Sequence, residues 1–187
     1  MDEIEKLVPV NPEEVASGKN PRYRMEDVWP IAVDVLEQLR PHCHRCQIAG
    51  SIRRGKDTIG DIEILAIPKT YNWGLFEEGL PEVVNKWKRV KGKLQGDCRN
   101  TIRILPCGIK LDLFLVNESN WGYHLAIRTG SAGFSKKKLG WRWRAMGFKG
   151  IDGDFTRDGV VIPVREEMDF FRLLEIRWIE PRYREVK

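Results

Sequence analysis

The spacing of apolar residues divides the chain into helical and extended segments. From Met25 to Leu39, apolar residues recur every three or four positions, which predicts an amphipathic helix that Pro41 ends. Shorter apolar runs predict four strands, at residues 46–49, 61–67, 99–105 and 109–116. The last two strands flank Pro106-Cys107-Gly108, which predicts a hairpin turn between them. The segment 76–87 is expected to contain a further helix that begins near Pro81.

The C-terminal part of the chain has shorter elements. Helices are predicted at 121–128, 136–146 and 166–174, and small strands with tight turns are predicted between 153 and 164. With 187 residues, the chain can form one substantial core or two small ones. We therefore expect an α+β fold in three parts: a polar lead segment at 1–24, a mixed sheet with helices at 25–120, and a small α+β subdomain at 121–187.

Acidic residues interrupt two of the predicted strands. Asp61 and Glu63 are two residues apart, so their side chains point to the same face of the strand. Two carboxylates on one face repel each other, and a divalent cation offsets that repulsion. Asp112 interrupts the strand 109–116 in the same way. If the two strands are neighbours, the three carboxylates form a site for two Mg²⁺ ions about 3.5–4 Å apart, with Mn²⁺ as the alternative metal.

The turn before the first acidic strand carries residues suited to phosphate binding. Gly50 lets backbone N–H groups approach phosphate oxygens, and Ser51 adds a hydroxyl. Arg54 supplies a rigid fork of donors for the same oxygens. The alternative is that Asp61 and Glu63 form the solvated face of an edge strand. Such a strand requires neither this turn nor this arginine, so we favour a catalytic site.

The motifs resemble those of the family X DNA polymerases, the polymerase-beta type within the nucleotidyltransferase superfamily. The segment from Gly50 to Gly55 matches the family pattern Gly-Ser-x-Arg-Arg-Gly, at the family's spacing from Asp61. Thr129-Gly130-Ser131 resembles the turn between the family's palm and thumb subdomains, and residues 169–185 resemble its closing stretch. The resemblance covers the chain from about Val28 to the C-terminus, with three motifs in the family's order.

The resemblance implies a nucleotidyltransferase palm at 25–120 and a thumb-like subdomain at 121–187. It implies a DNA polymerase that uses two metal ions to add dNMP from a dNTP to a primer 3′-hydroxyl. Metal binding and catalysis would fall to Asp61, Glu63 and Asp112. Six residues would bind the incoming nucleotide, the first three at its phosphates and the others beside its sugar and base: Gly50, Ser51, Arg54, Thr129, Gly130 and Ser131.

The chain departs from the family in ways that affect its expected specificity. Ile127-Arg128 stands where the family has two aromatic residues that exclude the ribose 2′-hydroxyl, and Ser135 replaces an asparagine that contacts the base. We therefore expect weakened discrimination against ribonucleotides. Two alternatives remain open: a template-independent terminal or RNA/small-molecule nucleotidyltransferase, and a non-catalytic DNA-end-binding module. The complete set of acids argues against the second.

The small size of the thumb favours gapped or nicked duplex DNA as the substrate, and hence short-gap filling in DNA repair by a monomer. The family's N-terminal helical subdomains are expected to be absent, because few residues precede the helix at Met25. The chain in this respect resembles the minimal palm-and-thumb members found in some viruses. We accordingly expect no deoxyribose-phosphate lyase activity.

The distribution of charge along the chain is more informative about its partners than the net charge. A formal net charge of +5 suits a polyanionic partner but is weak evidence alone. Basic residues gather after the Thr-Gly-Ser turn, and we expect them to contact DNA: Lys136, Lys137, Lys138, Arg142 and Arg144. Trp141 and Trp143 alternate with them, and for each tryptophan we favour packing in the core.

Two further features concern the environment of the protein. No apolar run approaches the roughly 20 residues of a membrane span, and the acidic N-terminus lacks the apolar region of a signal peptide. We expect an intracellular protein, in the cytoplasm, nucleoid or nucleus, with free thiols and no membrane partner. Cys43 and Cys46 have the spacing of half a zinc site, but the chain has no second Cys-x-x-Cys pair.

Overall fold

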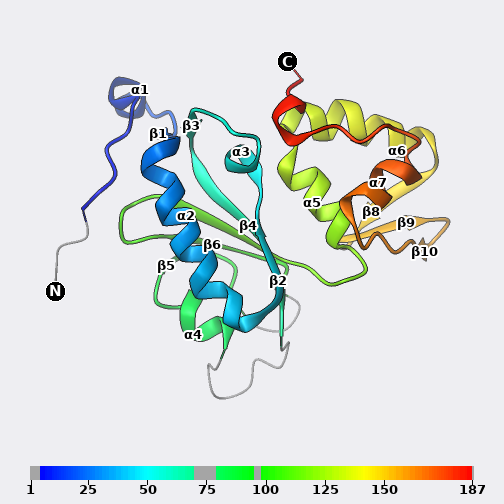
Figure 1. Ribbon diagram of the computed structural model, residues 1–187, viewed down its shortest axis with the longest axis horizontal. Coiled ribbons are helices and arrows are strands. Elements are labelled where there is room, and N and C mark those ends of the chain that lie inside the picture. The colour runs from blue at the N-terminus through cyan, green and yellow to red at the C-terminus, as the bar shows by residue number, and fades with distance from the viewer. Residues whose placement is uncertain (1–4, 70–78, 95–97, 187) are drawn as a thin grey trace. The chain divides into compact units, whose positions relative to one another are not determined.

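Figure 1 shows a computed structural model of the chain, of which residues 5–69, 79–94 and 98–186 are described. The chain divides into two compact units, Met1–Leu115 and Val116–Lys187. The division thus falls after Leu115, whereas the sequence placed it after residue 120. Each unit has a hydrophobic core of its own.

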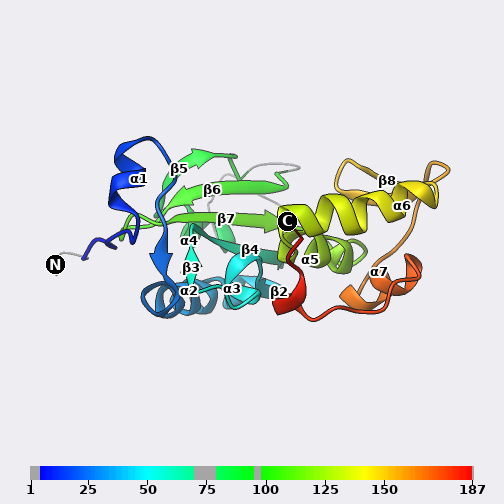
Figure 2. The same ribbon diagram turned by 90° about the horizontal axis from the view of Figure 1, so that it is seen from above.

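The first unit is built on a mixed five-stranded sheet, which confirms the expected α+β class. Its strands lie in the order β2-β4-β7-β6-β5. β4 and β7 pair in parallel, and the other neighbours are antiparallel. The strand bounds are Cys43–Ile48 for β2, Asp61–Pro68 for β4, Lys88–Lys91 for β5, Asn100–Ile104 for β6 and Lys110–Leu115 for β7. Figure 2 shows β6 and β7 lying side by side.

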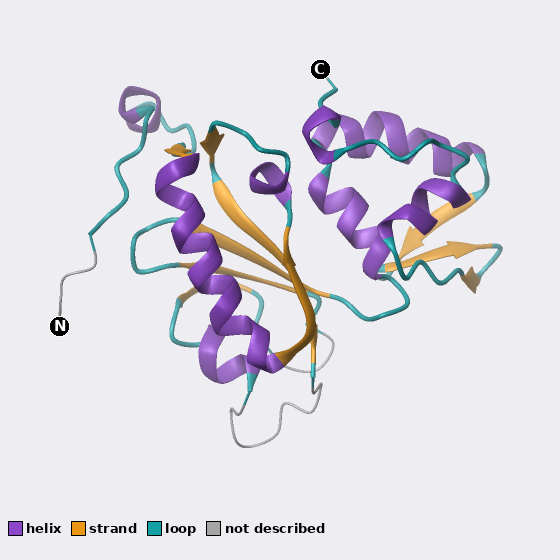
Figure 3. Cartoon of the chain, in the orientation of Figure 1, coloured by secondary structure: helices purple, strands orange, loops and turns teal. Residues whose placement is uncertain are grey.

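Helices cover one face of this sheet (Figure 3). α2 spans Met25–Leu39, as predicted, and the 3₁₀ turn Arg40–His42 follows it. Its buried residues share a core with alternate residues of the central strands: Val28, Ala32, Val35, Leu39, Ile62, Ile64, Leu111 and Leu113. Because successive strand residues point to opposite faces, the residues between these apolar ones lie on the other face.

The helix predicted within 76–87 is present, and it begins beside Pro81 as expected. α4 spans Leu80–Val84 and adds Leu80, Val83 and Val84 to the core of the first unit. The expectation for residues 76–78 lies outside the described residues. Asn85 follows α4, and its side-chain oxygen accepts a hydrogen bond of 3.1 Å from the buried Arg103 on β6.

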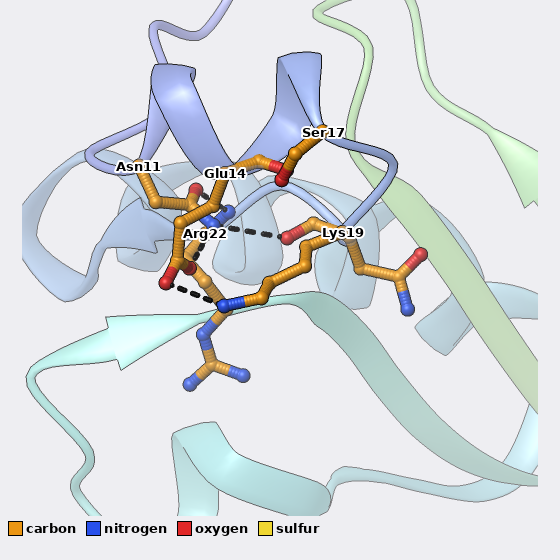
Figure 4. A network of polar contacts seen from close by, with 6 residues as sticks. Asn11, Glu14, Ser17, Lys19 and Arg22 are labelled. Carbon is orange, nitrogen blue, oxygen red and sulfur yellow. Dashed lines mark hydrogen bonds and ion pairs between the residues drawn. The ribbon is translucent and has the colours of Figure 1, made fainter.

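The described part of the lead segment pairs with the chain just before β4. It forms α1 at Pro12–Ala16 and β1 at Tyr23–Arg24, which pairs with β3 at Thr58–Ile59. Figure 4 shows the polar network that fixes it, in which the Arg22 N–H donates to the Asn11 side chain at 2.7 Å. The Arg22 guanidinium also donates to the Thr58 carbonyl at 2.5 Å. The lead segment therefore holds the chain immediately before β4.

The second unit combines helices with a small sheet. Its helices are α5 at Trp121–Thr129, α6 at Trp141–Ala145 and α7 at Glu167–Leu173, with the 3₁₀ turn Pro181–Tyr183 near the end. Its strands are β8 at Phe148–Ile151, β9 at Asp154–Arg157 and β10 at Val160–Val161. The strands thus begin before Gly153, earlier than predicted. The core is rich in aromatic rings, and Phe148 stacks on Phe155 with centroids 4.7 Å apart.

The helix predicted at 136–146 is not a continuous α-helix. Residues Phe134–Gly140 form a π-helix, and α6 follows it directly. Phe134 and Leu139 are five positions apart and are both buried. Five residues amount to more than one turn of an α-helix, whereas the i→i+5 pattern of a π-helix brings such residues onto one side. The positions of the apolar residues therefore account for the wider turn.

Candidate active site

The parallel pairing of β4 and β7 places three acidic residues on one face of the sheet. Glu63 is the direct partner of Asp112, and Asp61 is the partner of Lys110. The intervening residues Ile62 and Leu111 are fully buried in the core. The Asp112 side chain is 16% exposed and that of Asp61 is 30% exposed. Partly buried carboxylates remain accessible to a ligand but are poorly screened by water.

A lysine ammonium lies between two of these carboxylates. The Lys110 Nζ atom is 2.9 Å from Asp61 Oδ2 and 3.2 Å from Asp112 Oδ2. Burial lowers the pKa of the Lys110 ammonium, but hydrogen bonds and charges from Asp61 and Asp112 raise it, and the net shift of the pKa is upward. Lys110 is therefore held in its charged form at this position.

The third carboxylate lies against the Gly-Ser turn. Gly50 has a φ of +61°, and a Cβ atom at this position would overlap the carboxylate of Glu63. The backbone N–H of Ala49 donates to the Glu63 carbonyl at 2.8 Å, which joins the end of β2 to the acidic strand. Glycine is required here both for its left-handed conformation and for its lack of a side chain.

The residues expected to bind phosphate belong to this turn and to the short helix that starts there. Gly50–Arg53 form the short helix α3, in which Ser51 is half-buried, and Arg54 follows as its C-terminal cap. The loop from Arg54 to Asp61 passes through β3, which β1 and Arg22 hold in place. Gly50, Ser51 and Arg54 thus lie on the segment that leads directly into the acidic strand.

The chemistry of the donor set fits Mg²⁺, because hard oxygen ligands are those the ion prefers. Among the described residues, however, no three acidic, histidine or cysteine side chains are grouped closely enough to hold a metal. Two observations account for this arrangement. The Lys110 ammonium occupies the space between Asp61 and Asp112, and the Glu63 carboxylate lies at Gly50.

The Thr129-Gly130-Ser131 turn is held by contacts within the second unit. Thr129 and Gly130 are buried. Their contact with a nucleotide stays a prediction. The Ser131 hydroxyl accepts a hydrogen bond of 3.1 Å from the Phe134 N–H, and the Ser131 N–H donates to the Arg184 carbonyl at 3.2 Å. Residues near the C-terminus therefore fix the conformation of this turn.

A buried ion pair fastens that C-terminal segment. Arg184 is fully buried, and its guanidinium lies 2.6 Å from the carboxylate of Glu167 at the start of α7. The guanidinium also stacks near the rings of Phe171 and Trp178, with distances to the centroids of 4.9 and 5.7 Å. Removal of either charge would leave the other buried without its partner.

The basic residues after the turn fall into two groups. Lys136, Lys137, Lys138 and Arg144 are exposed on the π-helix and α6. Arg142 instead donates to the Leu174 carbonyl at 2.8 Å and pairs with Glu175 at 2.7 Å, so it joins α6 to the end of α7. Because its guanidinium makes these two interactions, Arg142 would have to give them up in order to contact DNA as predicted.

The two tryptophans among these basic residues have different environments. Trp143 packs on the aromatic core, as expected, with its ring 6.1 Å from that of Phe155. Trp141 is 66% exposed, so the prediction that it packs in the core is wrong. It lies three positions after Lys138 and three before Arg144, and that spacing indicates a helix face shared with basic residues.

Cys43 and Cys46 lie close together on β2, but the described residues offer them no third metal ligand. A hydrogen bond between the two thiols and burial raise the pKa of Cys43. The same hydrogen bond, together with the charge of Arg40, lowers the pKa of Cys46. The pair carries free thiols and supports no zinc site within the described chain.

Lys110 was missed by the sequence analysis, although a signal was present. It lies two positions before Asp112, and residues two apart on a strand share a face. The exposure of Trp141 could also have been inferred from its basic neighbours at helical spacing.

Comparisons with known proteins add no family assignment: no protein-family model matches the chain, and no curated protein matches its sequence. Within the described residues, none of the helices has the length and apolar character needed to cross a membrane.

Proposed function

We propose that the chain is a family X DNA polymerase, a palm-type nucleotidyltransferase that adds dNMP to a DNA 3′-hydroxyl. The observation that carries the proposal is the register of β4 and β7, in which Glu63 lies opposite Asp112 with Asp61 on the same face. A solvated edge strand does not account for this arrangement, because β4 and β7 are the second and third strands of a five-stranded sheet.

Asp61, Glu63 and Asp112 would hold two Mg²⁺ ions. When bound, such ions lower the pKa of an attacking hydroxyl and stabilise the charge of a leaving pyrophosphate. The roles of the protein's own groups are binding and orientation. The carboxylates would fix the position of the acceptor, and the register of the two strands keeps them aligned before substrate arrives.

The phosphates of the incoming nucleotide would be bound by the segment before β4. The Ser51 hydroxyl and the Arg54 guanidinium are donors suited to phosphate oxygens. The contact between Gly50 and the Glu63 carboxylate links this segment to the acids, so one loop orients the nucleotide and positions a ligand of the metal. These are positioning effects, which supply much of the rate enhancement in phosphoryl-type transfers.

The acceptor would be bound by the exposed basic residues of the second unit. Lys136, Lys137, Lys138 and Arg144 suit the phosphate backbone of DNA. Trp141 adds an exposed ring that can stack on a base or pack against a sugar. Gapped or nicked duplex in a repair reaction is the proposed substrate.

A panel of acceptors tests this function. The protein is incubated with Mg²⁺ and a labelled dNTP, and with gapped duplex, single-stranded DNA or RNA in turn. Template-matched addition to gapped duplex supports the polymerase. Unmatched addition to single strands indicates a terminal transferase. Addition to RNA alone indicates a nucleotidyltransferase that acts on RNA. DNA binding without any transfer would leave a non-catalytic end-binding module.

A further inference from the structure

The space between Asp61 and Asp112 already contains a cation, the ammonium of Lys110. The nitrogen approaches Oδ2 of both carboxylates, at 2.9 and 3.2 Å. The position of Lys110 follows from the strand geometry, since it is the direct partner of Asp61 and lies two residues before Asp112. One side chain thus bridges two of the three acids proposed to bind metal.

We propose that Lys110 is a built-in counter-cation, which holds Asp61 and Asp112 in the metal-free protein and is displaced when a divalent cation binds. The inference rests on the proposed function, because it concerns the same three carboxylates. It adds a property of the site that the proposed reaction does not require: binding of the metal is an exchange of one cation for another.

The two cations exclude each other because they use the same oxygens. Mg²⁺ binds carboxylate oxygens at about 2.0–2.1 Å, whereas the Lys110 nitrogen lies 2.9 Å from Asp61 Oδ2. A metal ion held by Asp61 and Asp112 would compete with the ammonium for the same carboxylates and would repel its charge. Lys110 must therefore leave this position before the carboxylates can close around a metal.

Lys110 also has an effect when no metal is present. The carboxylates of Asp61 and Asp112 both lie within 3.2 Å of the Lys110 nitrogen, and the Asp112 side chain is only 16% exposed. Without this ammonium, the two carboxylates would repel each other with limited screening by water. The lysine relieves that repulsion, so it stabilises the empty site and at the same time weakens the apparent affinity for metal.

Two substitutions of Lys110 test the exchange. Lys110→Met removes the charge and keeps most of the side-chain volume, and Lys110→Gln serves if the first variant does not fold. The matched control is Lys88→Met, which removes one exposed positive charge from β5 of the same sheet. Free Mn²⁺ is titrated against each full-length protein by electron paramagnetic resonance, and thermal unfolding is followed with EDTA and with Mn²⁺.

We expect both Lys110 variants to bind Mn²⁺ about five- to tenfold more tightly than the unmodified protein, which is the size expected for loss of a partly exposed ion pair. We also expect their unfolding temperature to fall in EDTA and to rise further than that of the unmodified protein when Mn²⁺ is added. Lys88→Met should change neither quantity. This pattern supports the exchange.

Two results would overturn the inference, and they have different meanings. If the unmodified protein binds Mn²⁺ and the Lys110 variants bind it equally or more weakly, Lys110 is an ordinary surface ion pair and the two-metal function stands. If neither the unmodified protein nor any Lys110 variant binds Mn²⁺, the carboxylates are not a metal site, and the proposed function fails as well.

Discussion

The carboxylate of Glu63 lies so close to the backbone of Gly50 that a side chain at position 50 would overlap it. This contact couples the Gly-Ser turn to the acidic strand. A change at the turn therefore moves a carboxylate as well as the backbone. The effect of backbone strain can be separated from the effect on Glu63, because Gly108 also has a positive φ but has no atom near the place of a Cβ.

Gly50→Ala should reduce nucleotidyl transfer far more than it reduces stability. The φ of +61° at this position makes alanine unfavourable by about 1–3 kcal/mol. The added Cβ would also displace the Glu63 carboxylate. We expect a loss of kcat of about 100-fold or more, the size seen when one positioned hydrogen-bond donor is removed from an active site. Urea unfolding and primer extension measure the two effects.

The control for this variant is Gly108→Ala. Gly108 has a φ of +99°, and no atom lies within 4 Å of the place that a Cβ would occupy. Alanine at this position therefore introduces the backbone strain alone. Equal activities for the two variants at equal stability would show that the contact between Gly50 and Glu63 has no functional consequence.

Arg184→Met should destabilise the second unit strongly. It would leave the Glu167 carboxylate buried without its charged partner, which costs about 3–5 kcal/mol in other proteins. Arg182→Met is the matched control, because the pair of Arg182 with Glu180 is exposed and should contribute less than about 1 kcal/mol. Equal midpoints of urea unfolding for the two variants would contradict the importance of the buried pair.

Trp141→Ala should weaken DNA binding without destabilising the fold. Its ring is 66% exposed among basic residues, and stacking on one base contributes about 1–3 kcal/mol. Trp29→Ala removes a comparably exposed ring from α2, outside the basic stretch, and should leave affinity unchanged. Fluorescence anisotropy with a labelled gapped duplex measures both. Unchanged affinity for Trp141→Ala would remove this residue from the DNA-binding surface.

Discrimination between dATP and ATP should be weak. Ile127-Arg128 lacks the aromatic pair that excludes the 2′-hydroxyl in family X polymerases, and the Ile127 carbonyl is instead held by the Ser135 hydroxyl at 2.7 Å. We expect the ratio of kcat/KM for dATP over ATP to lie below about 10⁴, which corresponds to roughly 5–6 kcal/mol. Steady-state kinetics with each nucleotide gives the ratio, and a larger value would contradict the prediction.

Local patterns in the sequence were sufficient for some elements. The helix Met25–Leu39 has the predicted bounds, because its apolar spacing is regular and Pro41 follows it. The hairpin of β6 and β7 was also predicted, since Pro106-Cys107-Gly108 separates two runs with strand-like spacing of apolar residues. In both cases the signal lies within a few neighbouring residues.

Other features depend on contacts that are distant in the sequence. The parallel pairing of β4 with β7 brings Glu63 opposite Asp112 across 49 positions of chain, and nothing local specifies it. The bridge formed by Lys110 follows only once that register is known. The π-helix allows both Phe134 and Leu139 to be buried in an aromatic core to which several elements contribute. The sequence could indicate the acids of the site and that Lys110 shares a strand face with Asp112, but not that its ammonium also reaches Asp61.

The most direct test of the central claim is primer extension on a duplex with a one-nucleotide gap. Each dNTP is supplied separately with Mg²⁺, and the unmodified protein is compared with Asp112→Asn and with Asp158→Asn, which removes an exposed carboxylate from the second unit. We predict template-matched incorporation that Asp158→Asn retains and that Asp112→Asn loses by about 10³-fold or more. Incorporation that persists in a folded Asp112→Asn variant would contradict the three-carboxylate site.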